Sequence, residues 1–197
     1  MTKIVFATGN QGKMREITQI MADMDVEVVS MKEAGIFIDI EENGTTFEEN
    51  ALIKARAIAK EANAIVLADD SGLEIDFLDK APGVLSARYM GEDTPYEVKN
   101  GHILSLLKDV QGAERSARFV CSIAAVFPDG REFTTYATIE GEIAYESAGE
   151  NGFGYDPIFY VPQFGKTTAE LSADEKNKIS HRGKALSMMK EILQKEI

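Results

Sequence analysis

The stretch AIVLADDSGLEID, residues 64–76, places two acidic residues directly after a continuous apolar run. Such a run is typical of a strand that is covered on both faces, as in a parallel sheet flanked by helices. We expect the strand to end there and to present Asp69 and Asp70 at its carboxyl end, where open α/β sheets bind ligands. Because adjacent strand residues point to opposite sides, one carboxylate could hold Mg²⁺ or activate water while the other fixes the turn. Alternatively, both aspartates simply cap the turn before Ser71.

The segments on either side of this run alternate between strand and helix patterns. Residues 46–59 combine capping-box spacing, at Thr46 and Glu49, with an apolar stripe of helical period. Further strands are predicted at 3–7, 26–30, 117–127 and 132–144 and around DPIFY (156–160), and further helices at 11–22, 95–107 and after Ser180. The runs at 117–127 and 132–144 are joined by a Pro-Asp-Gly turn, a strong hairpin signal. The sequence therefore predicts an α/β fold in a single domain over residues 1–197: a two-lobed mixed sheet with flanking helices, a long central β-hairpin, and an active-site cleft between the lobes.

The composition is that of an ordinary soluble protein, with 44% hydrophobic and 27% charged residues. No apolar run approaches a membrane span or a signal peptide, so we expect a cytoplasmic protein without membrane contact. The single cysteine, Cys121, excludes an internal disulfide, and with only two histidines beside it a His/Cys zinc site is not expected. The net charge of −12 disfavours nucleic acid as a partner but allows a small polyanionic substrate in a locally basic pocket.

A second polar motif, ATGNQGK at residues 7–13, follows the first predicted strand. Gly9 lets the backbone approach a ligand, and Asn10 is a favoured helix cap. The amides of the following helix start could hold an anion, with Lys13 one turn further on as a point charge. The motif lacks both the Walker and the dinucleotide glycine patterns, so a plain capped helix with a surface lysine is an equal alternative.

Three further segments carry candidate ligand-binding residues. Glu41 and Glu42 precede a helix start, where one of them could give Mg²⁺ a second carboxylate; a solvated acidic loop is the alternative. The segment GENGFGYDP, residues 149–157, places glycines beside aromatic residues that could stack on a base or form a structural loop. The segment EKNKISHRG, residues 175–183, puts cations at a helix N-terminus. The helix dipole disfavours cations there, and this misfit indicates a functional role.

Taken together, these segments resemble the inosine triphosphate pyrophosphatase family, the house-cleaning purine nucleoside triphosphatases. The resemblance runs from residue 7 to the closing helix and rests on blocks in the family's order and approximate spacing: ATGNQGK, ENGTTFEENALIKA, ADDSGLEID, APGVLSARYMG, GFGYDPIF and ISHRGKAL. It implies hydrolysis of the bond between the α- and β-phosphates of ITP, dITP and XTP, which yields the monophosphate and pyrophosphate. It also implies Mg²⁺ as the cofactor, a purine nucleoside triphosphate as the small-molecule partner, and a homodimer.

The resemblance also implies roles for individual residues by their motif positions. Asp70 is the expected catalytic proton acceptor and a metal ligand, and Glu42 is the second metal ligand. Glu42 is preferred over Glu41 because the family's glutamate lies two positions before the glycine of this segment. His181 and Arg182 are expected to read the 6-keto edge of the base. The other residues implied to bind substrate are the triphosphate seat Thr8, Gly9, Asn10, Gln11, Gly12 and Lys13, then Ser71 and Lys176, and the base-framing Phe153, Gly154, Tyr155 and Asp156.

Other functions are alternatives to this interpretation. A related Maf-like pyrophosphatase of pyrimidine triphosphates is disfavoured by the SHR and FGYDP blocks. A non-catalytic nucleotide-binding module would have little need for the carboxylates of Asp70 and Glu42. A serine hydrolase built on Ser71 lacks a nucleophile elbow and would have only two histidines as candidates for its base.

Overall fold

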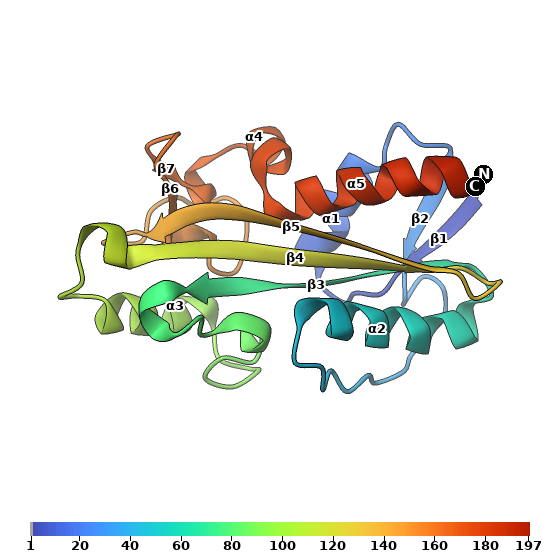
Figure 1. Cartoon of the computed structure of the whole chain (residues 1–197), viewed down its shortest axis with the longest axis horizontal. Helices are drawn as coiled ribbons and strands as arrows, with labels where there is room; N and C mark the ends of the chain where they lie inside the picture. The colour runs from blue at the N-terminus through green and yellow to red at the C-terminus, as the bar shows by residue number, and fades with distance from the viewer. Residues whose placement is uncertain (1) are drawn as a thin grey trace. The chain divides into compact units, whose positions relative to one another are not determined.

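The computed structural model describes residues 2–197, which form a mixed α/β fold with seven strands and five α-helices. The strand order in the sheet is β2-β1-β3-β4-β5-β6-β7 (Figure 1). β1 pairs in parallel with β2 and β3, whereas β6 pairs antiparallel with β5 and β7. None of the helices in residues 2–197 is long and apolar enough to cross a membrane. The elements are β1 (Thr2–Phe6), α1 (Gln11–Ile20), β2 (Val26–Ser30), α2 (Phe47–Ala62), β3 (Ile65–Ile75), α3 (Tyr96–Leu106), β4 (Ser116–Val126), β5 (Glu132–Ile143), β6 (Phe159–Val161), β7 (Lys166–Thr167), α4 (Ala173–Ile179) and α5 (His181–Glu196).

Two compact units make up this chain. The first comprises the chain up to Asp70 together with Cys121–Ala137 and His181–Ile197, and the second comprises Ser71–Val120 and Thr138–Ser180. The long strands β3, β4 and β5 therefore each contribute residues to both units. The predicted α/β class, the mixed sheet and the long hairpin of β4 and β5 are confirmed, and the cleft expected between two lobes stays a prediction.

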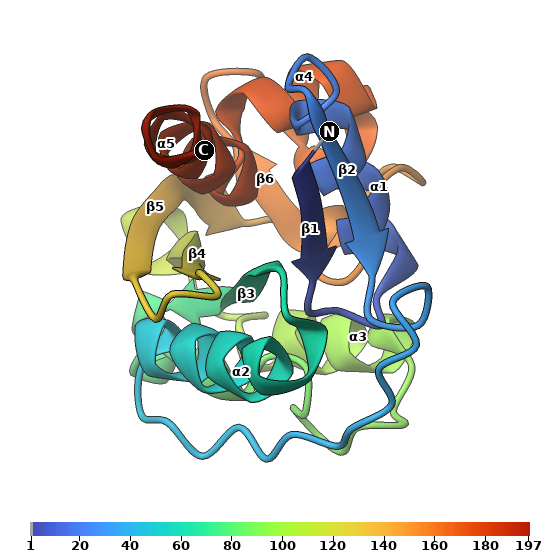
Figure 2. The same cartoon turned by 90° about the vertical axis from the view of Figure 1, so that its right-hand side faces the viewer.

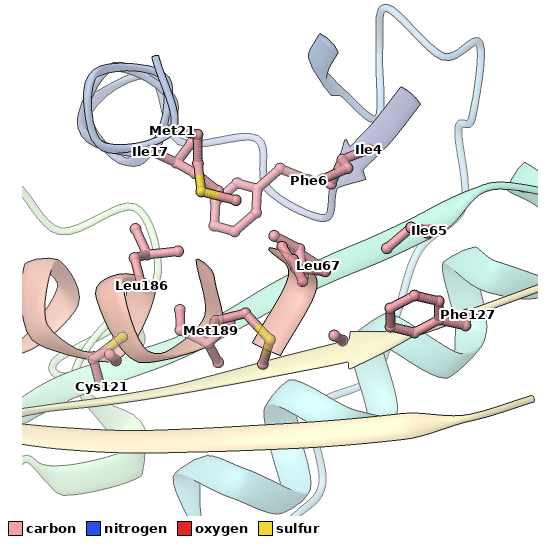
Figure 3. Close-up of a cluster of buried hydrophobic side chains, with 14 residues drawn as sticks. Ile4, Phe6, Ile17, Met21, Ile65, Leu67, Cys121, Phe127, Leu186 and Met189 are labelled. Carbon is pink, nitrogen blue, oxygen red and sulfur yellow. The ribbon is translucent and has the colours of Figure 1, made fainter. Parts of the chain in front are cut away.

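In the first unit, one face of the sheet packs against α1 and α5. Every second residue of β1, β3 and β4 belongs to this face, because successive strand side chains point to opposite sides. Figure 3 shows side chains from these strands meeting those of the two helices. The buried members of the cluster are Ile4, Phe6, Ile17, Met21, Ile65, Leu67, Cys121, Ile123, Ala125, Phe127, Ala185, Leu186, Met189 and Leu193.

The opposite face of the same strands packs against α2. The intervening strand residues form a second cluster with the alanine-rich side of this helix, and Figure 2 shows α2 and α5 on opposite sides of the strands. Both faces are thus covered, which explains the continuous apolar run and confirms that prediction. The buried members are Val5, Ala7, Ile36, Ala51, Ala55, Ile58, Val66, Ala68, Ala124 and Val126.

The start of α2 is fixed by the predicted capping box. Thr46 Oγ1 accepts a hydrogen bond from Glu49 N at 3.1 Å, and Thr46 N donates to Glu49 Oε2 at 3.2 Å. This reciprocal pair satisfies two backbone donors at the helix end.

The core of the second unit is separate from these clusters. Phe119 of β4 and Phe159 of β6 pack with ring centroids 4.3 Å apart. α3 contributes Ile103, which is fully buried, and β3 contributes Leu73 and Ile75. The end of β3 therefore belongs to a different core from its beginning.

One predicted strand end is wrong for this reason. β3 does not stop after the apolar run but continues to Ile75, so Asp69 and Asp70 lie within the strand. In the continued part of the strand, Leu73 and Ile75 are both fully buried. The parallel partner β1 does end here, since its pairing with β3 stops at Phe6 opposite Leu67. Asp69 and Asp70 therefore come after the end of the parallel pairing between β1 and β3, although β3 itself continues beyond them.

The segment DPIFY is also only partly a strand. Asp156–Ile158 forms a 3₁₀ turn, and the strand β6 begins at Phe159. Pro157 explains the difference, because its fixed φ suits a helical turn and it has no N–H to donate to a strand partner.

Candidate active site

The segment between β1 and α1 is a capped helix start. Asn10 Oδ1 accepts hydrogen bonds from Gly12 N at 2.8 Å and Lys13 N at 3.2 Å, and Thr8 Oγ1 accepts one from Asn10 N at 3.1 Å. Asn10 is thus the helix cap, as predicted. A Cβ added at Gly9 meets no atom within 4 Å, so the backbone is open to approach at this residue. The triphosphate seat expected at residues 8–13 stays a prediction.

Lys13 and Arg182 meet on the buried carboxylate of Asp69. Lys13 Nζ lies 2.9 Å from Asp69 Oδ2 and 3.0 Å from Oδ1, and Arg182 Nε lies 3.2 Å from Oδ2. Arg182 also pairs with Glu16 of α1. Asp69 is only 1% exposed and Arg182 only 2%, so these charges are in the interior of the first unit. Asp69 therefore anchors one cation from α1 and one from α5.

The electrostatics of this group keep Asp69 ionised. Burial favours the neutral acid, but the charges of Lys13 and Arg182 outweigh it and hold the pKa of Asp69 well below its usual range. Burial likewise disfavours the charged form of Arg182, yet Asp69 and Glu16 raise its pKa. The same two carboxylates explain how a cation is tolerated at the N-terminus of α5. Asp69 is therefore a fixed anion rather than a proton acceptor.

Asp70 is oriented from α2. Asn50 Nδ2 donates to Asp70 Oδ2 at 3.1 Å, and Asn50 Oδ1 accepts from Gly44 N at 2.8 Å, so the amide is held on both sides. Burial raises the pKa of Asp70, and the opposing effects of Lys54 and Asn50 do not bring it back to its usual range. Asp70 is therefore the better proton acceptor of the two adjacent aspartates.

Lys54, one turn after Asn50 on α2, joins Asp70 to Glu42. Its Nζ lies 2.9 Å from Glu42 Oε2 and 3.8 Å from Asp70 Oδ1. Glu41, by contrast, is exposed. A solvated acidic loop therefore describes Glu41 but not Glu42, which belongs to the group around Asp70.

Glu42 and Asp70 suit Mg²⁺ by their chemistry. Mg²⁺ prefers oxygen ligands and, where nucleotides are processed, is held by one or two carboxylates together with substrate phosphates. Both carboxylates already face one cation, the Lys54 ammonium, so their oxygens can converge on a positive charge. Within residues 2–197, no group of three or more His, Cys, Asp and Glu side chains could hold a metal. The pair thus fits an ion that takes its remaining ligands from phosphate and water.

The second unit organises the expected base-framing loop around Asp156. Asp156 Oδ2 accepts from Phe153 N at 2.8 Å and pairs with Lys176 Nζ at 2.7 Å, and Asp156 Oδ1 accepts from Thr168 Oγ1 at 2.8 Å. Lys176 Nζ also lies 4.8 Å from the centroid of the Phe153 ring. Lys176 is 5% exposed, so its charge is held against the loop and not in solvent. It therefore fixes both the loop backbone and the aromatic ring.

The next two loop residues are held by neighbouring segments of the same unit. Asn100 Nδ2 of α3 donates to Gly154 O at 3.1 Å, and Tyr155 OH donates to Ser86 O at 2.7 Å. The Tyr155 ring is buried and meets Tyr96 of α3 edge to face. Ser86 belongs to the block APGVLSARYMG, for which the sequence suggested no role. This block supports the loop through Ser86.

The structure places the expected site residues in two groups, one in each unit. Ser71 follows Asp70 in β3 and is half-buried, and His181, the first residue of α5, is 6% exposed. The first unit holds Thr8, Gly9, Asn10, Gln11, Gly12, Lys13, Glu42, Asp70, His181 and Arg182. The second unit holds Ser71, Phe153, Gly154, Tyr155, Asp156 and Lys176.

Sequence reasoning missed Asn50, Lys54 and Glu16. Asn50 and Lys54 are four residues apart in the block ENGTTFEENALIKA, and each precedes an alanine of the apolar stripe. That spacing puts them on one side of the helix, at the edge of the stripe that faces the sheet. Glu16 follows Lys13 by three residues and lies on the same side of α1. Helical periodicity applied to polar residues could therefore have found all three.

Comparison with known proteins gives a consistent result. The family model described as "Ham1 family" matches residues 4–192. A dITP/XTP pyrophosphatase of Caldanaerobacter subterraneus subsp. tengcongensis is 50% identical over 198 residues, covering 100% of this chain and 98% of the relative. A dITP/XTP pyrophosphatase of Desulforamulus reducens is 49% identical over 191 residues, covering 97% of this chain and 95% of the relative.

The fold is shared with a solved structure as well. A HAM1 protein from Coxiella burnetii superposes with a TM-score of 0.89 at 43% identity, covering 99% of this chain and 100% of that one. The family resemblance inferred from the sequence motifs is thereby confirmed. With a family model and full-length relatives that both span nearly all of its residues, this chain belongs to the Ham1 family.

Proposed function

We propose that this chain is an Mg²⁺-dependent hydrolase that converts ITP, dITP and XTP to the monophosphate and pyrophosphate and so cleanses the nucleotide pool. The observation that carries the proposal is the pair of buried aspartates with different surroundings in β3. Asp69 anchors Lys13 and Arg182, and Asp70 shares the Lys54 ammonium with Glu42. The relatives named dITP/XTP pyrophosphatase support the same reaction class.

Two carboxylates carry out the chemistry of the proposed hydrolysis. Glu42 and Asp70 would hold Mg²⁺, which when bound neutralises charge on the phosphates. Asp70 would orient the attacking water and take its proton. The hydrogen bond from Asn50 leaves the other oxygen of Asp70, Oδ1, on the side of Lys54. Phosphoryl chemistry asks a protein mainly for such positioning and charge neutralisation.

The base is selected by hydrogen-bond donors and a framing loop. His181 and Arg182 donate to the 6-keto oxygen of hypoxanthine or xanthine, and Asp69 and Glu16 hold the Arg182 guanidinium in place. ATP carries an amino group at that position, which leaves the donors unpaired at a cost of roughly 1–3 kcal/mol. Phe153, Gly154, Tyr155 and Asp156 frame the base, with Lys176 and Ser71 as further substrate contacts.

Lys13→Ala is expected to weaken triphosphate binding about ten- to a hundredfold, since a hydrogen bond to a charged group is worth about 1.5–3 kcal/mol. The Lys13 side chain is 17% exposed, so a ligand can reach it. Calorimetric titration with ITP and with IMP measures the effect, and the loss should be larger for ITP. Arg15→Ala, an exposed cation on the same helix, is the matched control. An unchanged affinity for ITP would remove the triphosphate seat from the proposal.

Gly44→Ala is expected to lower kcat about ten- to a hundredfold, with a smaller effect on KM, because misplaced catalytic groups lose rate on this scale. An added Cβ would lie 2.6 Å from Asn50 Oδ1 and 3.0 Å from Asn50 N, which forces the amide that orients Asp70 to move. Steady-state kinetics with ITP measure the change. Gly101→Ala is the control, because a Cβ there meets no atom within 4 Å. Wild-type kcat in a folded Gly44→Ala protein would contradict this role of Asn50.

We also propose that the protein is a homodimer in the cytoplasm and that it binds neither nucleic acid nor membrane. The net charge of −12 supports the exclusion of nucleic acid, because such a surface repels the phosphate backbone. Light scattering on the purified protein tests the dimer, which should have twice the mass of the chain.

Pyrophosphate release from ITP, XTP, dITP, ATP, GTP, TTP and UTP, with and without Mg²⁺, tests the function as a whole. Metal-dependent release from the inosine and xanthosine nucleotides is expected. Release mainly from TTP or UTP would instead make the protein a pyrimidine triphosphatase. Binding of ITP without turnover would make it a nucleotide-binding module.

A further inference from the structure

Lys54 lies against the two carboxylates, Glu42 and Asp70, that are proposed to hold the metal ion. Its Nζ contacts Glu42 Oε2 at 2.9 Å and lies 3.8 Å from Asp70 Oδ1. Only 12% of the Lys54 side chain and 10% of the Asp70 side chain are exposed, so water screens this pair weakly, whereas Glu42 is 32% exposed. The ammonium is thus the counter-ion of both carboxylates.

The position of Lys54 is fixed by the helix that carries it. α2 begins at Phe47 behind a complete capping box, and Ala51 and Ala55 on its buried side are fully inaccessible. Asn50, one turn earlier, is bonded to Asp70 Oδ2. Since Asn50 occupies that oxygen, Asp70 Oδ1 is the one directed to Lys54.

Two carboxylates balance the charge of the Lys54 ammonium. Its Nζ is within 4 Å of a carboxylate oxygen of both Glu42 and Asp70, at 2.9 Å and 3.8 Å. A divalent cation placed between Glu42 and Asp70 would therefore meet a positive charge within a few ångströms. Like charges at such a distance repel strongly where water is largely excluded.

We propose that Lys54 competes with the divalent cation for Glu42 and Asp70, so that the free protein binds metal weakly and the metal enters together with the triphosphate. This inference rests on the proposed function, which assigns the two carboxylates to Mg²⁺. The ammonium satisfies the carboxylates while the site is without nucleotide. The triphosphate then supplies the negative charge that both cations need, so metal and nucleotide bind with positive coupling.

Lys54→Met tests the competition directly. The electron paramagnetic resonance signal of free Mn²⁺, recorded without nucleotide, gives the metal affinity of each protein. Lys54→Met should bind Mn²⁺ at least about tenfold more tightly than wild type, because it removes the competing charge and keeps a similar side-chain length. Lys54→Arg, which keeps the charge, should restore weak binding. Lys60→Met, an exposed lysine near the end of the same helix, should leave the affinity unchanged.

Several outcomes would overturn the inference. Equal Mn²⁺ affinity in wild type and Lys54→Met would mean that the ammonium does not compete. A gain in affinity that persists when Glu42→Gln is added would place the metal elsewhere. Lys54→Gln provides the same comparison if the methionine variant does not fold. Failure of the proposed function is distinguishable: it would appear as no pyrophosphate release by wild type, whatever the metal affinities are.

Discussion

Asp70→Asn is expected to reduce pyrophosphate release from ITP by about 10²–10⁴-fold, the range over which a positioned proton acceptor contributes. The asparagine keeps the shape of the side chain but cannot accept the proton of the attacking water, and it is a poorer metal ligand. Quenched assays with ITP at saturating Mg²⁺ measure the loss.

The fold should survive this substitution. The pKa of Asp70 is raised in the folded protein because burial disfavours its charge. A carboxyl group with a raised folded-state pKa lowers stability at neutral pH, so a neutral asparagine should leave the free energy of unfolding unchanged or increase it. Asp79→Asn is the matched control, because Asp79 is exposed and has a φ of 51°, which asparagine tolerates well. A folded Asp70→Asn protein with wild-type turnover would refute the assigned base.

Asp69→Asn is expected to lower the free energy of unfolding by about 3–5 kcal/mol at pH 7, the usual loss when one partner of a buried ion pair is removed. The substitution would leave Lys13 and Arg182 without the carboxylate that both of them contact. Arg182 is 2% exposed, so water would replace that carboxylate poorly. Urea unfolding followed by circular dichroism gives the free-energy difference.

The difference in the free energy of unfolding between wild type and Asp69→Asn should become smaller at low pH. The pKa of Asp69 is depressed in the folded state, so its contribution to stability is complete above the unfolded-state pKa of about 3.9. Below that pH the unfolded chain takes up a proton and the contribution is lost, whereas asparagine does not titrate. The free energy of unfolding of wild type should therefore approach that of Asp69→Asn as the pH falls below about 4. Asp39→Asn, an exposed residue of the same unit, should show neither effect. A gap that stays constant with pH would exclude the ion pair as its cause.

The sequence alone determined the features that depend on neighbouring residues. The cap at Asn10 and the box formed by Thr46 and Glu49 each join residues two or three positions apart. The apolar run before Asp69 predicted a strand covered on both faces, because such a strand has no solvent-facing side on which polar residues are needed. The motif blocks, read in order, were sufficient to identify the family.

Only the tertiary structure decided which charges meet. The partners of Asp69 on α1 and α5 lie 56 and 113 residues away in the chain, and no local pattern encodes such distances. The sequence could not show whether Asp69 or Asp70 would pair with Lys13 and Arg182, because the two aspartates differ only in the side of β3 to which they point. It also gave no sign that β3 continues past its turn-forming residues, since that depends on Leu73 and Ile75 reaching a second core. Local hydrogen bonds follow from the order of residues, whereas the pairing of buried charges follows from how strands and helices pack.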